Sequence, residues 1–443
     1  MRPWLFNLIY FGVLLFFAPL LLYRAVRHGK YRRGFRQKFL GQIPQRLQVL
    51  KNRPESAQTK IIWFHAVSVG EVQLLRPLIR KISDTLPDWC CAVSTTSRTG
   101  MDLAQQLFGK DWTVFYCPLD FSWAVKEAFR RLKPDMLVLV EQELWPNLIE
   151  TAKKNGLKLA IVNGRFGDGG YKRYLWIRPI ITPLLRQIDL IAPQNELYAG
   201  WFRRLGVSSE VIRITGSIKF DGANTDRNNP ETERLRKLAG ISMEDVVFLA
   251  GSTQHPEEMY AVKCYEHLKK DFPQLRLIIV PRHPERFDEV SAMLDTKEIL
   301  WERRSMLEDG RQQTADDNRE SARVLLVDSV GELGSWWGTA AIAFVGGSMG
   351  KRGGQNMIEP AAYGAAVSFG PNTKNFRDIV AMMLRDEAAQ VVHDQREMEQ
   401  FVRRCLEEPD FAKQLGNNAK GLVQRQVGAT QKTLDLLQAL GKG

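Results

Sequence analysis

The stretch Phe-Val-Gly-Gly-Ser-Met-Gly-Lys-Arg-Gly-Gly-Gln-Asn-Met-Ile-Glu-Pro at residues 344–360 decides the fold that the sequence predicts. An apolar run at residues 341–345 leads into it as a buried strand would, and a glycine-rich loop and a helical pattern follow. Glycine lets backbone N–H groups approach a phosphate closely, and a helix that starts near Asn356 would direct its positive end at the same anion. Glu359, about one turn into that helix, could accept hydrogen bonds from ribose hydroxyls. The stretch indicates a nucleotide site in a doubly wound α/β domain, with an ordinary tight turn between strand and helix as the alternative.

The positive charge of the chain is confined to its first part. The 443 residues hold 62 Lys and Arg against 50 Asp and Glu, a formal net charge of +12. Residues 1–53 contain eleven of the basic residues and no acidic one, which leaves 51 basic and 50 acidic residues in the rest of the chain. A basic excess confined to one segment argues against a nucleic-acid partner. The five cysteines, an odd number without C-x-x-C spacing, indicate reduced core thiols and no zinc site.

The same first part carries an apolar segment. Residues 4–23 are twenty residues without a charge, enough at ~1.5 Å per residue to cross a ~30 Å hydrocarbon core. The basic residues that follow would lie in the cytoplasm and attract anionic lipid headgroups. A cleaved signal peptide is the alternative, but no small-residue cleavage site follows. We expect residues 1–53 to form a membrane anchor, which either spans the inner membrane or lies deep in its interface, with the following domains in the cytoplasm. The basic residues are Arg24, Arg27, Lys30, Arg32, Arg33, Arg36 and Lys38.

A candidate base follows the first predicted strand of the folded part. The run Ile-Ile-Trp-Phe-His-Ala-Val at residues 61–67 precedes Ser68-Val-Gly-Glu71 and then a helical pattern. Gly70 provides the turn, and Glu71 would lie at the helix N-terminus, where the helix dipole and unpaired N–H groups keep a carboxylate ionised. Such a carboxylate is a plausible general base. An N-terminal cap is the commoner role for a lone glutamate and stays open as the alternative.

Polar residues end several strands in both halves of the chain. In an open α/β sheet the carboxyl edge of the strands carries the ligands, so these junctions indicate a site. A polar, turn-rich segment at residues 222–233 separates the two series of strands, and we place a domain boundary at residue 225. The predicted fold is α/β of the GT-B kind, with two doubly wound Rossmann-like domains facing across a cleft, residues 54–225 for the acceptor and 226–443 for the nucleotide sugar, after the membrane-anchor helix. The junctions lie at residues 95–100, 141–147, 163–165, 251–253, 281–284 and 328–333.

These residues closely resemble one family, the 3-deoxy-D-manno-octulosonic acid (Kdo) transferases of lipopolysaccharide assembly, glycosyltransferase family 30. The resemblance runs from the N-terminal segment to about residue 380, and the motifs together, in order, are far more specific than any one of them. The matching motifs are Ser-Val-Gly-Glu (68–71), Glu-Leu-Trp-Pro-Asn (143–147), Thr-Gly-x-x-Lys-Phe-Asp (215–221), Gly-Ser-Thr (251–253), Val-Pro-Arg-His-Pro-Glu-Arg (280–286), Gly-Glu-Leu (331–333), Phe-Val-Gly-Gly-Ser (344–348) and Gly-Pro-x-Thr-x-Asn-Phe (370–376).

The resemblance implies an inverting transfer of Kdo from CMP-Kdo to a lipid A precursor of the lipid IVA type. It implies Glu71 as the general base and Glu141 and Lys219 as stabilisers of the transition state. No Asp-x-Asp clamp for a metal occurs, so we expect a metal-independent reaction without a cofactor. The residues expected at the nucleotide sugar are Ser252, Thr253, Pro281, Arg282, His283, Val330, Gly331, Glu332, Gly346, Gly347, Asn356, Met357, Ile358 and Glu359. Those expected to face the acceptor are Ser68, Gly70, Arg98, Thr99 and Glu143.

Three positions depart from the family pattern. Gln355 stands where the family usually has His, His255 lies one place later than usual, and Ser97-Arg98-Thr99 replaces Thr-Pro-Thr. None of them touches Glu71. The alternatives are another membrane-associated GT-B glycosyltransferase with a different nucleotide sugar, and a non-catalytic sugar-nucleotide-binding membrane protein, which would not need a base.

Overall fold

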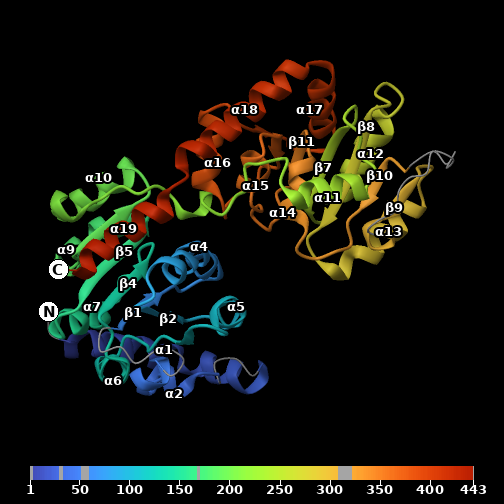
Figure 1. Ribbon diagram of the computed structural model, residues 1–443. Coiled ribbons are helices and arrows are strands. Elements are labelled where there is room, and N and C mark those ends of the chain that lie inside the picture. Colours follow the sequence, from blue (N-terminus) through green and yellow to red (C-terminus); the bar gives the residue numbers. More distant parts are fainter. Residues whose placement is uncertain (1–2, 29–32, 51–58, 167–169, 308–321, 443) are drawn as a thin grey trace. The chain divides into compact units, whose positions relative to one another are not determined.

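The computed structural model describes residues 3–28, 33–50, 59–166, 170–307 and 322–442 (Figure 1). The chain divides into two compact units, Met1–Gly222 with Val427–Gly443, and Ala223–Gln426. The break after residue 222 lies close to the predicted boundary at 225. The C-terminal segment differs from the prediction, because residues 427–443 belong to the first unit and not to the second.

The return of the C-terminal segment has a clear physical cause. Helix α19 (Ala429–Lys442) buries Leu434 and Leu437 in the core of the first unit. The Asp221 carboxylate accepts hydrogen bonds from the backbone N–H groups of Gly428 and Thr430, which caps the start of the helix. An amphipathic helix carries no mark of which sheet it will cover, so the sequence pattern alone does not assign it.

The first unit is built on a six-stranded parallel sheet with the order β3-β2-β1-β4-β5-β6. The strands are buried on both faces, as parallel sheets require, and β4 is buried at every position. The strands are β1 (Lys60–His65), β2 (Trp89–Thr95), β3 (Thr113–Tyr116), β4 (Met136–Val140), β5 (Lys158–Gly164) and β6 (Leu190–Pro193). The helices are α1 (Pro3–His28), α2 (Phe35–Leu40), α3 (Arg46–Leu50), α4 (Val69–Thr85), α5 (Arg98–Phe108), α6 (Ser122–Leu132), α7 (Pro146–Lys154), α8 (Gly170–Trp176), α9 (Arg178–Leu185), α10 (Glu196–Arg204) and α19.

The second unit holds a seven-stranded parallel sheet with the order β13-β12-β11-β7-β8-β10-β9. Its strands are β7 (Val246–Thr253), β8 (Leu275–Pro281), β9 (Trp301–Arg303), β10 (Val324–Leu326), β11 (Ile342–Val345), β12 (Ala366–Phe369) and β13 (Gln390–Val391). Its helices are α11 (Pro230–Leu238), α12 (Glu257–Leu268), α13 (Phe287–Asp295), α14 (Leu333–Trp336), α15 (Ile358–Ala362), α16 (Arg377–Arg385), α17 (Gln395–Glu407) and α18 (Pro409–Gln426). The prediction of two doubly wound α/β domains is confirmed.

Each sheet has one point where the chain reverses its direction of winding. In the first unit this point lies between β1 and β4, and in the second it lies between β7 and β11. Loops that leave the carboxyl ends of two such strands diverge to opposite faces and leave a crevice, which is where ligands bind in folds of this kind. A ligand is therefore expected at the segments that follow β1, β4, β7 and β11.

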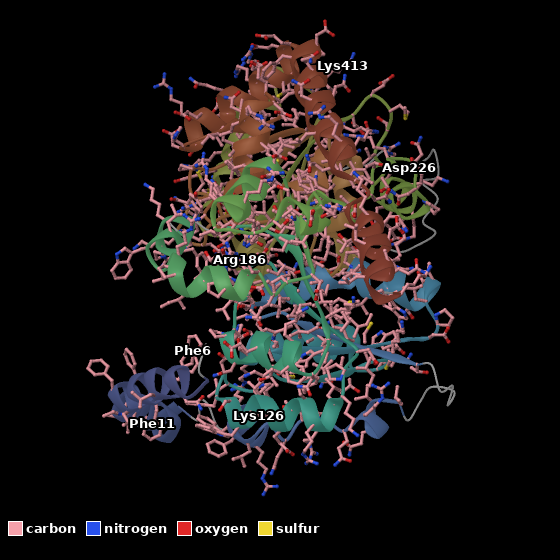
Figure 2. The ribbon with its side chains drawn as sticks, turned by 90° about the vertical axis from the view of Figure 1, so that its left-hand side faces the viewer. Phe6, Phe11, Lys126, Arg186, Asp226 and Lys413 are labelled. Atoms are coloured by element: carbon pink, nitrogen blue, oxygen red, sulfur yellow. The ribbon has the colours of Figure 1, made fainter. Side chains whose placement is uncertain are left out.

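The apolar segment near the N-terminus forms the helix α1, which Figure 2 shows with Phe6 and Phe11 labelled. Phe6 is buried, whereas Phe11 and Phe16 are 53% and 79% exposed. No helix in the described part of the chain is both long and apolar enough to cross a membrane, which corrects the prediction of a spanning anchor. Of the basic residues predicted to follow the helix, Lys30 and Arg32 lie outside the described residues.

Candidate functional site

Glu71 lies in the first turn of α4, directly after β1, at the switch point of the first sheet. Ser68 Oγ accepts a hydrogen bond from the N–H of Glu71 at 3.3 Å and donates one to Glu71 Oε1 at 2.8 Å. The N–H of Val67 donates to Oε2 at 2.8 Å. This reciprocal arrangement resembles the capping box of a helix N-terminus, except that the Glu71 carboxylate accepts from the N–H of Val67, the residue before the N-cap Ser68. The predicted alternative role as a cap is therefore real, and it holds the carboxylate in one position.

The electrostatics of Glu71 also suit a base. The residue is 7% exposed, and burial raises its pKa to about 7. The bonds from Val67 and Ser68 oppose this rise. The nearby carboxylates of Glu143 and Glu141 add to it. A carboxyl group whose pKa lies near neutrality can take a proton from a hydroxyl and release it again at physiological pH.

Glu141 follows β4 on the other side of the switch point. Its φ of +61° lies in the left-handed region, which costs a non-glycine residue about 1–2 kcal/mol. The backbone is held there by a bond from the N–H of Glu141 to the carbonyl of Val162 at 2.9 Å. Its carboxylate lies 2.7 Å from Arg165 Nε and 3.9 Å from Lys219 Nζ. The structure thus brings together the two residues predicted to stabilise the transition state, and it adds Arg165 as a third charge.

Glu143 lies at the same carboxyl edge of the first sheet, where a hydrogen bond from Trp145 holds its carboxylate. The indole Nε1 donates to Glu143 Oε2 at 3.0 Å, and burial raises the pKa of the Glu143 carboxyl. The indole makes a T-shaped contact with the ring of His65, the last residue of β1, with ring centroids 5.5 Å apart. His65 is fully buried and burial lowers its pKa to about 4, so the ring is neutral and donates no charge to the site. The acceptor-side loop is therefore packed against β1, the strand that leads into the helix of the candidate base.

The other predicted acceptor residues lie at the same carboxyl edge. Ser68 and Gly70 are exposed at the start of α4, and Arg98 and Thr99 are exposed in the first turn of α5. These helices follow β1 and β2, which are neighbours in the sheet. Arg98 lies 3.9 Å from Asp102 on its own helix, a surface pair that leaves the guanidinium accessible.

The glycine loop after β11 differs from the prediction in an important respect. The N–H groups of Gly347, Ser348 and Met349 donate to the carboxylate of Glu257 at 2.7–2.9 Å. The N–H of Gln254 makes a fourth bond to it at 2.8 Å. Glu257 is 1% exposed. An internal carboxylate thus occupies the anion-binding nest that the sequence assigns to a phosphate. The contact of Gly346 and Gly347 with the nucleotide sugar stays a prediction.

The same carboxylate explains why glycine is needed after β11. A Cβ on Gly346 would lie 2.6 Å from Thr253 Cα and 2.7 Å from Glu257 Oε2. Gly347 has a φ of +64°, which places it in the left-handed region. The glycine pair therefore permits close packing around Glu257.

The Asn356–Glu359 segment keeps its predicted place but not its predicted helix. Helix α15 begins at Ile358 and has only five residues, so it is shorter and later than expected. Asn356 Nδ2 donates to Glu359 Oε1 at 2.9 Å, and Asn356 Oδ1 accepts from the N–H of Ile358 at 3.2 Å. Burial raises the pKa of Glu359, while the Asn356 bond and the Arg282 guanidinium oppose the rise. Met357 is buried and serves the core.

The end of β8 places Arg282 near that glutamate. The N–H of Arg282 donates to the carbonyl of Thr253 at 3.0 Å, and its side chain is exposed. Ser252, at the end of β7, has a φ of +55°. Pro281 is the buried last residue of β8, and His283 follows with a partly buried ring. The predicted residues Ser252, Thr253, Arg282 and Glu359 therefore gather at the switch point of the second sheet.

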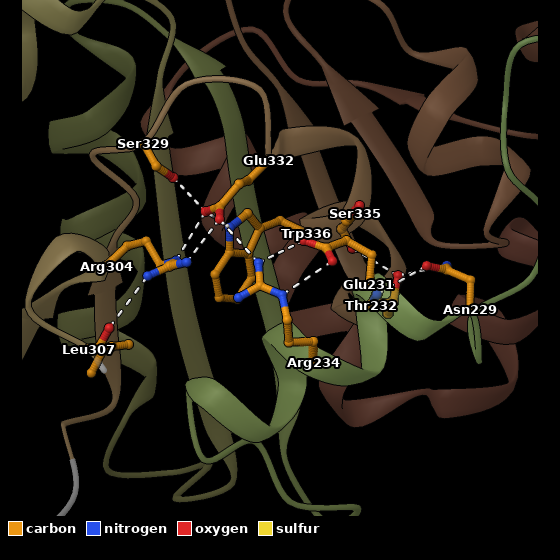
Figure 3. Close-up of polar contacts among 10 residues, drawn as sticks. All are labelled: Asn229, Glu231, Thr232, Arg234, Arg304, Leu307, Ser329, Glu332, Ser335 and Trp336. Atoms are coloured by element: carbon orange, nitrogen blue, oxygen red, sulfur yellow. Dashed lines mark hydrogen bonds and ion pairs between the residues drawn. The ribbon is translucent and has the colours of Figure 1, made fainter. Parts of the chain in front are cut away.

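The carboxylate of Glu332 has protein partners that the sequence pattern did not indicate. Figure 3 shows its carboxylate held by Arg304, Ser329, Trp336 and Arg234. Burial would raise the pKa of Glu332, but the bonds from Ser329 and Arg304 outweigh burial and lower it. The carboxylate is thus committed to protein partners. The exposed neighbours Val330 and Gly331 remain accessible.

Sequence reasoning missed two carboxylates: Glu257, which holds the loop after β11, and Asp120, which accepts hydrogen bonds from the N–H groups of Asn147 and Leu148 at the start of α7. Most of the N–H groups that they bind are distant in sequence, and no local pattern marks such a contact. Among the described residues no group of three or more His, Cys, Asp and Glu side chains is arranged to hold a metal ion.

Comparison with known proteins adds an independent line of evidence. The family model described as 3-deoxy-D-manno-octulosonic-acid transferase (kdotransferase) matches residues 41–222. The 3-deoxy-D-manno-octulosonic acid transferase of Haemophilus influenzae is 32% identical over 378 residues, which cover 85% of this chain and 86% of the relative. That of Chlamydia muridarum is 28% identical over 451 residues, covering 99% and 98%. The solved structure of a glycosyltransferase from Rickettsia africae has a TM-score of 0.54 at 14% identity, covers 87% of this chain and 99% of that one, and is similar in fold.

Proposed function

The chain belongs to the 3-deoxy-D-manno-octulosonic acid (Kdo) transferase family, and on this premise we propose that it transfers Kdo from CMP-Kdo to a lipid A precursor of the lipid IVA type. The acceptor hydroxyl attacks the anomeric carbon from the face opposite the leaving group, so the configuration inverts. The new C–O bond forms as the bond to the CMP phosphate breaks, and the hydroxyl proton passes to Glu71.

The placement of Glu71 is the observation that supports this proposal most. It is a buried carboxylate at the switch point, held by two hydrogen bonds, with a pKa of about 7. A binding protein gains nothing from a base poised in this way, whereas a transferase needs one to deprotonate an alcohol late in the reaction. The Lys219 and Arg165 cations near Glu141 can offset negative charge that develops during the transfer.

The second unit supplies the donor side of the proposal. Arg282 provides positive charge for the single phosphate of CMP, and Glu359 provides an acceptor for ribose hydroxyls. Because this donor has one phosphate and no pyrophosphate, we propose a metal-independent reaction, and activity should persist in the presence of EDTA.

The direct test is transfer itself. The full chain is incubated with CMP-Kdo and a tetraacylated lipid A precursor, and Kdo-bearing lipid and CMP are quantified. We expect one CMP released for each Kdo transferred. Activity with a UDP sugar but none with CMP-Kdo would favour the alternative GT-B glycosyltransferase, and tight CMP-Kdo binding without transfer would favour the non-catalytic alternative.

Arg282→Ala should weaken CMP binding. A charge-assisted hydrogen bond contributes about 1.5–3 kcal/mol, so the dissociation constant should rise roughly 10- to 100-fold. Calorimetry with CMP measures this directly. Arg396→Ala, an exposed arginine on α17 of the same unit, is the matched control and should bind CMP normally. Unchanged CMP affinity in Arg282→Ala would remove Arg282 from the donor site.

We also propose that α1 attaches the protein to the cytoplasmic face of the inner membrane, where a lipid acceptor is presented. The exposed side chains Leu8, Phe11 and Phe16 give the helix an apolar surface that water does not favour, and the basic α2 segment follows it.

Replacing these three residues by serine should move most of the protein from the membrane to the soluble fraction. Met243→Ser, at an 89% exposed position of the second unit, is the control. Membrane recovery equal to that of the wild type would contradict attachment through α1.

A further inference from the structure

Helix α1 does more than expose apolar residues, because its first half is fastened to the first unit by polar bonds. Tyr10 Oη donates to Asp120 Oδ2 at 2.9 Å. Asn7 Nδ2 donates to Ser122 Oγ at 2.7 Å, and Asn7 Oδ1 accepts from the N–H of Ser122 at 2.9 Å. These two side chains lie one turn apart on the same face of α1 as the buried Phe6. We call this group, Asn7, Tyr10, Asp120, Ser122 and Asn147, the α1 latch.

The latch caps two helices of the first unit. Asp120 Oδ2 also accepts from the N–H of Asn147 at 3.0 Å, and Oδ1 accepts from the N–H of Leu148 at 2.9 Å. These N–H groups belong to the first turn of α7, whose own N-cap residue is Trp145, a side chain that cannot accept. Asn7 likewise supplies the acceptor at the start of α6, where Phe121 offers none. Both helix starts depend on acceptors from elsewhere in the chain.

Helix α7 continues the segment that carries Glu141 and Glu143. Residues 141–145, which we call the acceptor loop, lead directly into Pro146 at the start of α7, and Trp145 bonds to Glu143. A carboxylate at 5% exposure, such as Asp120, is costly to bury unless its oxygens are fully bonded, and Tyr10 provides one of its three bonds. Burial and the Asp120 charge raise the pKa of Tyr10, so its hydroxyl stays protonated and donates.

We propose that the α1 latch positions the acceptor loop, so that docking of α1 on the first unit is required for full binding of the lipid acceptor. The proposal rests on the proposed function, since it concerns the same acceptor. It makes Tyr10 and Asp120 positioning residues that act through the start of α7, and it gives α1 a role in catalysis beyond attachment. Donor binding, which belongs to the second unit, is independent of the latch.

The test compares kinetics for the two substrates in the full chain. Tyr10→Phe removes one hydroxyl and keeps the apolar surface of α1, so membrane attachment should persist. The KM for the tetraacylated lipid acceptor should rise about five- to tenfold, less than the full value of a bond to a charged group because Tyr10 acts on the acceptor only through α7, while the KM for CMP-Kdo stays within about twofold. Tyr23→Phe removes a hydroxyl from the exposed end of the same helix and should leave both KM values unchanged.

A double-mutant cycle then asks whether Tyr10 acts through Asp120. Asp120→Asn should raise the acceptor KM at least as much as Tyr10→Phe, and the double variant should be no worse than Asp120→Asn alone. A merely structural latch would lower the melting temperature and spare the ratio of the two KM values. An unchanged acceptor KM in Tyr10→Phe, or additive effects in the cycle, would overturn the proposal while wild-type transfer still supports the function. A wild type without any Kdo transfer would overturn the proposed function itself.

Discussion

Glu71→Gln should lower the turnover of Kdo transfer by about 10²–10⁴-fold, because glutamine has nearly the same shape but cannot take a proton from the acceptor hydroxyl. The hydrogen bonds of Glu71 also indicate how much of its surroundings the substitution would preserve. In the wild type, Glu71 Oε2 accepts from the N–H of Val67 and Oε1 accepts from Ser68 Oγ. The serine hydroxyl can rotate to accept from an amide, so most of the capping box survives the substitution.

Measurements on one preparation separate the catalytic role from the structural one. A lost cap costs about 1 kcal/mol of stability, so the melting temperature should fall only slightly while turnover collapses. CMP affinity should be nearly unchanged, since the nucleotide residues belong to the other unit. Glu210→Gln, an exposed glutamate in the first unit, controls for the change of charge and should be fully active. A normally active Glu71→Gln enzyme with a lowered melting point would leave Glu71 only its role as a cap.

The pKa of Glu71 also sets the pH dependence. A base must be ionised to act, so kcat/KM should fall as the pH falls through about 7, the value to which burial raises this group. Glu143→Gln removes a neighbouring negative charge that adds to the rise, and it should move this limb of the profile to lower pH. A profile that is flat between pH 6 and 8 would contradict the assignment of Glu71 as the base.

Features that depend on local sequence were predictable. The alternation of apolar runs and helical patterns gave two doubly wound sheets, because parallel strands buried on both faces require long apolar runs. Ser68 and Glu71 stand three residues apart before a helix, which is the sequence pattern of a capping box. The polar junctions after β1, β4, β7 and β8 were likewise visible, since each follows an apolar run directly.

Features that depend on contacts between distant segments were not predictable. Glu257 lies ninety residues before the loop whose N–H groups it binds. The sequence of a glycine-rich loop does not show whether its N–H groups bind an internal carboxylate or a phosphate. Glu332 matches a motif, yet its partners Arg304 and Arg234 come from other elements (Figure 3). The cap that Asp120 provides at the start of α7 was not predicted for the same reason, because its partners Asn147 and Leu148 are distant in sequence. A pattern of residue types identifies which groups can bind an anion, and tertiary structure decides which anion they meet.

Glu257→Ala should lower the free energy of unfolding of the second unit by roughly 3–5 kcal/mol, because it leaves four backbone N–H groups without their acceptor. Glu257→Gln offers a graded comparison. Oε1 accepts from Ser348 and Met349, and Oε2 accepts from Gly347 and Gln254. An amide keeps one oxygen in either orientation, so two of the four bonds remain and the loss should be about half as large. Denaturant unfolding of the three proteins measures this series, with Glu244→Ala, an exposed glutamate of the same unit, as the control.

The same variants distinguish an internal clamp from a vacant phosphate site. If the nest exists to hold Glu257, then acetate or inorganic phosphate should restore part of the stability of Glu257→Ala, since either anion can replace the missing carboxylate. The wild type should show no such stabilisation by phosphate at this loop, because its four donors are already satisfied. If instead the nest receives the phosphate of the donor, Glu257→Ala should bind CMP more tightly than the wild type, since a competing carboxylate has been removed. Tighter CMP binding with undiminished stability would therefore show that the glycine loop binds the donor phosphate and that Glu257 competes with that phosphate for the N–H groups.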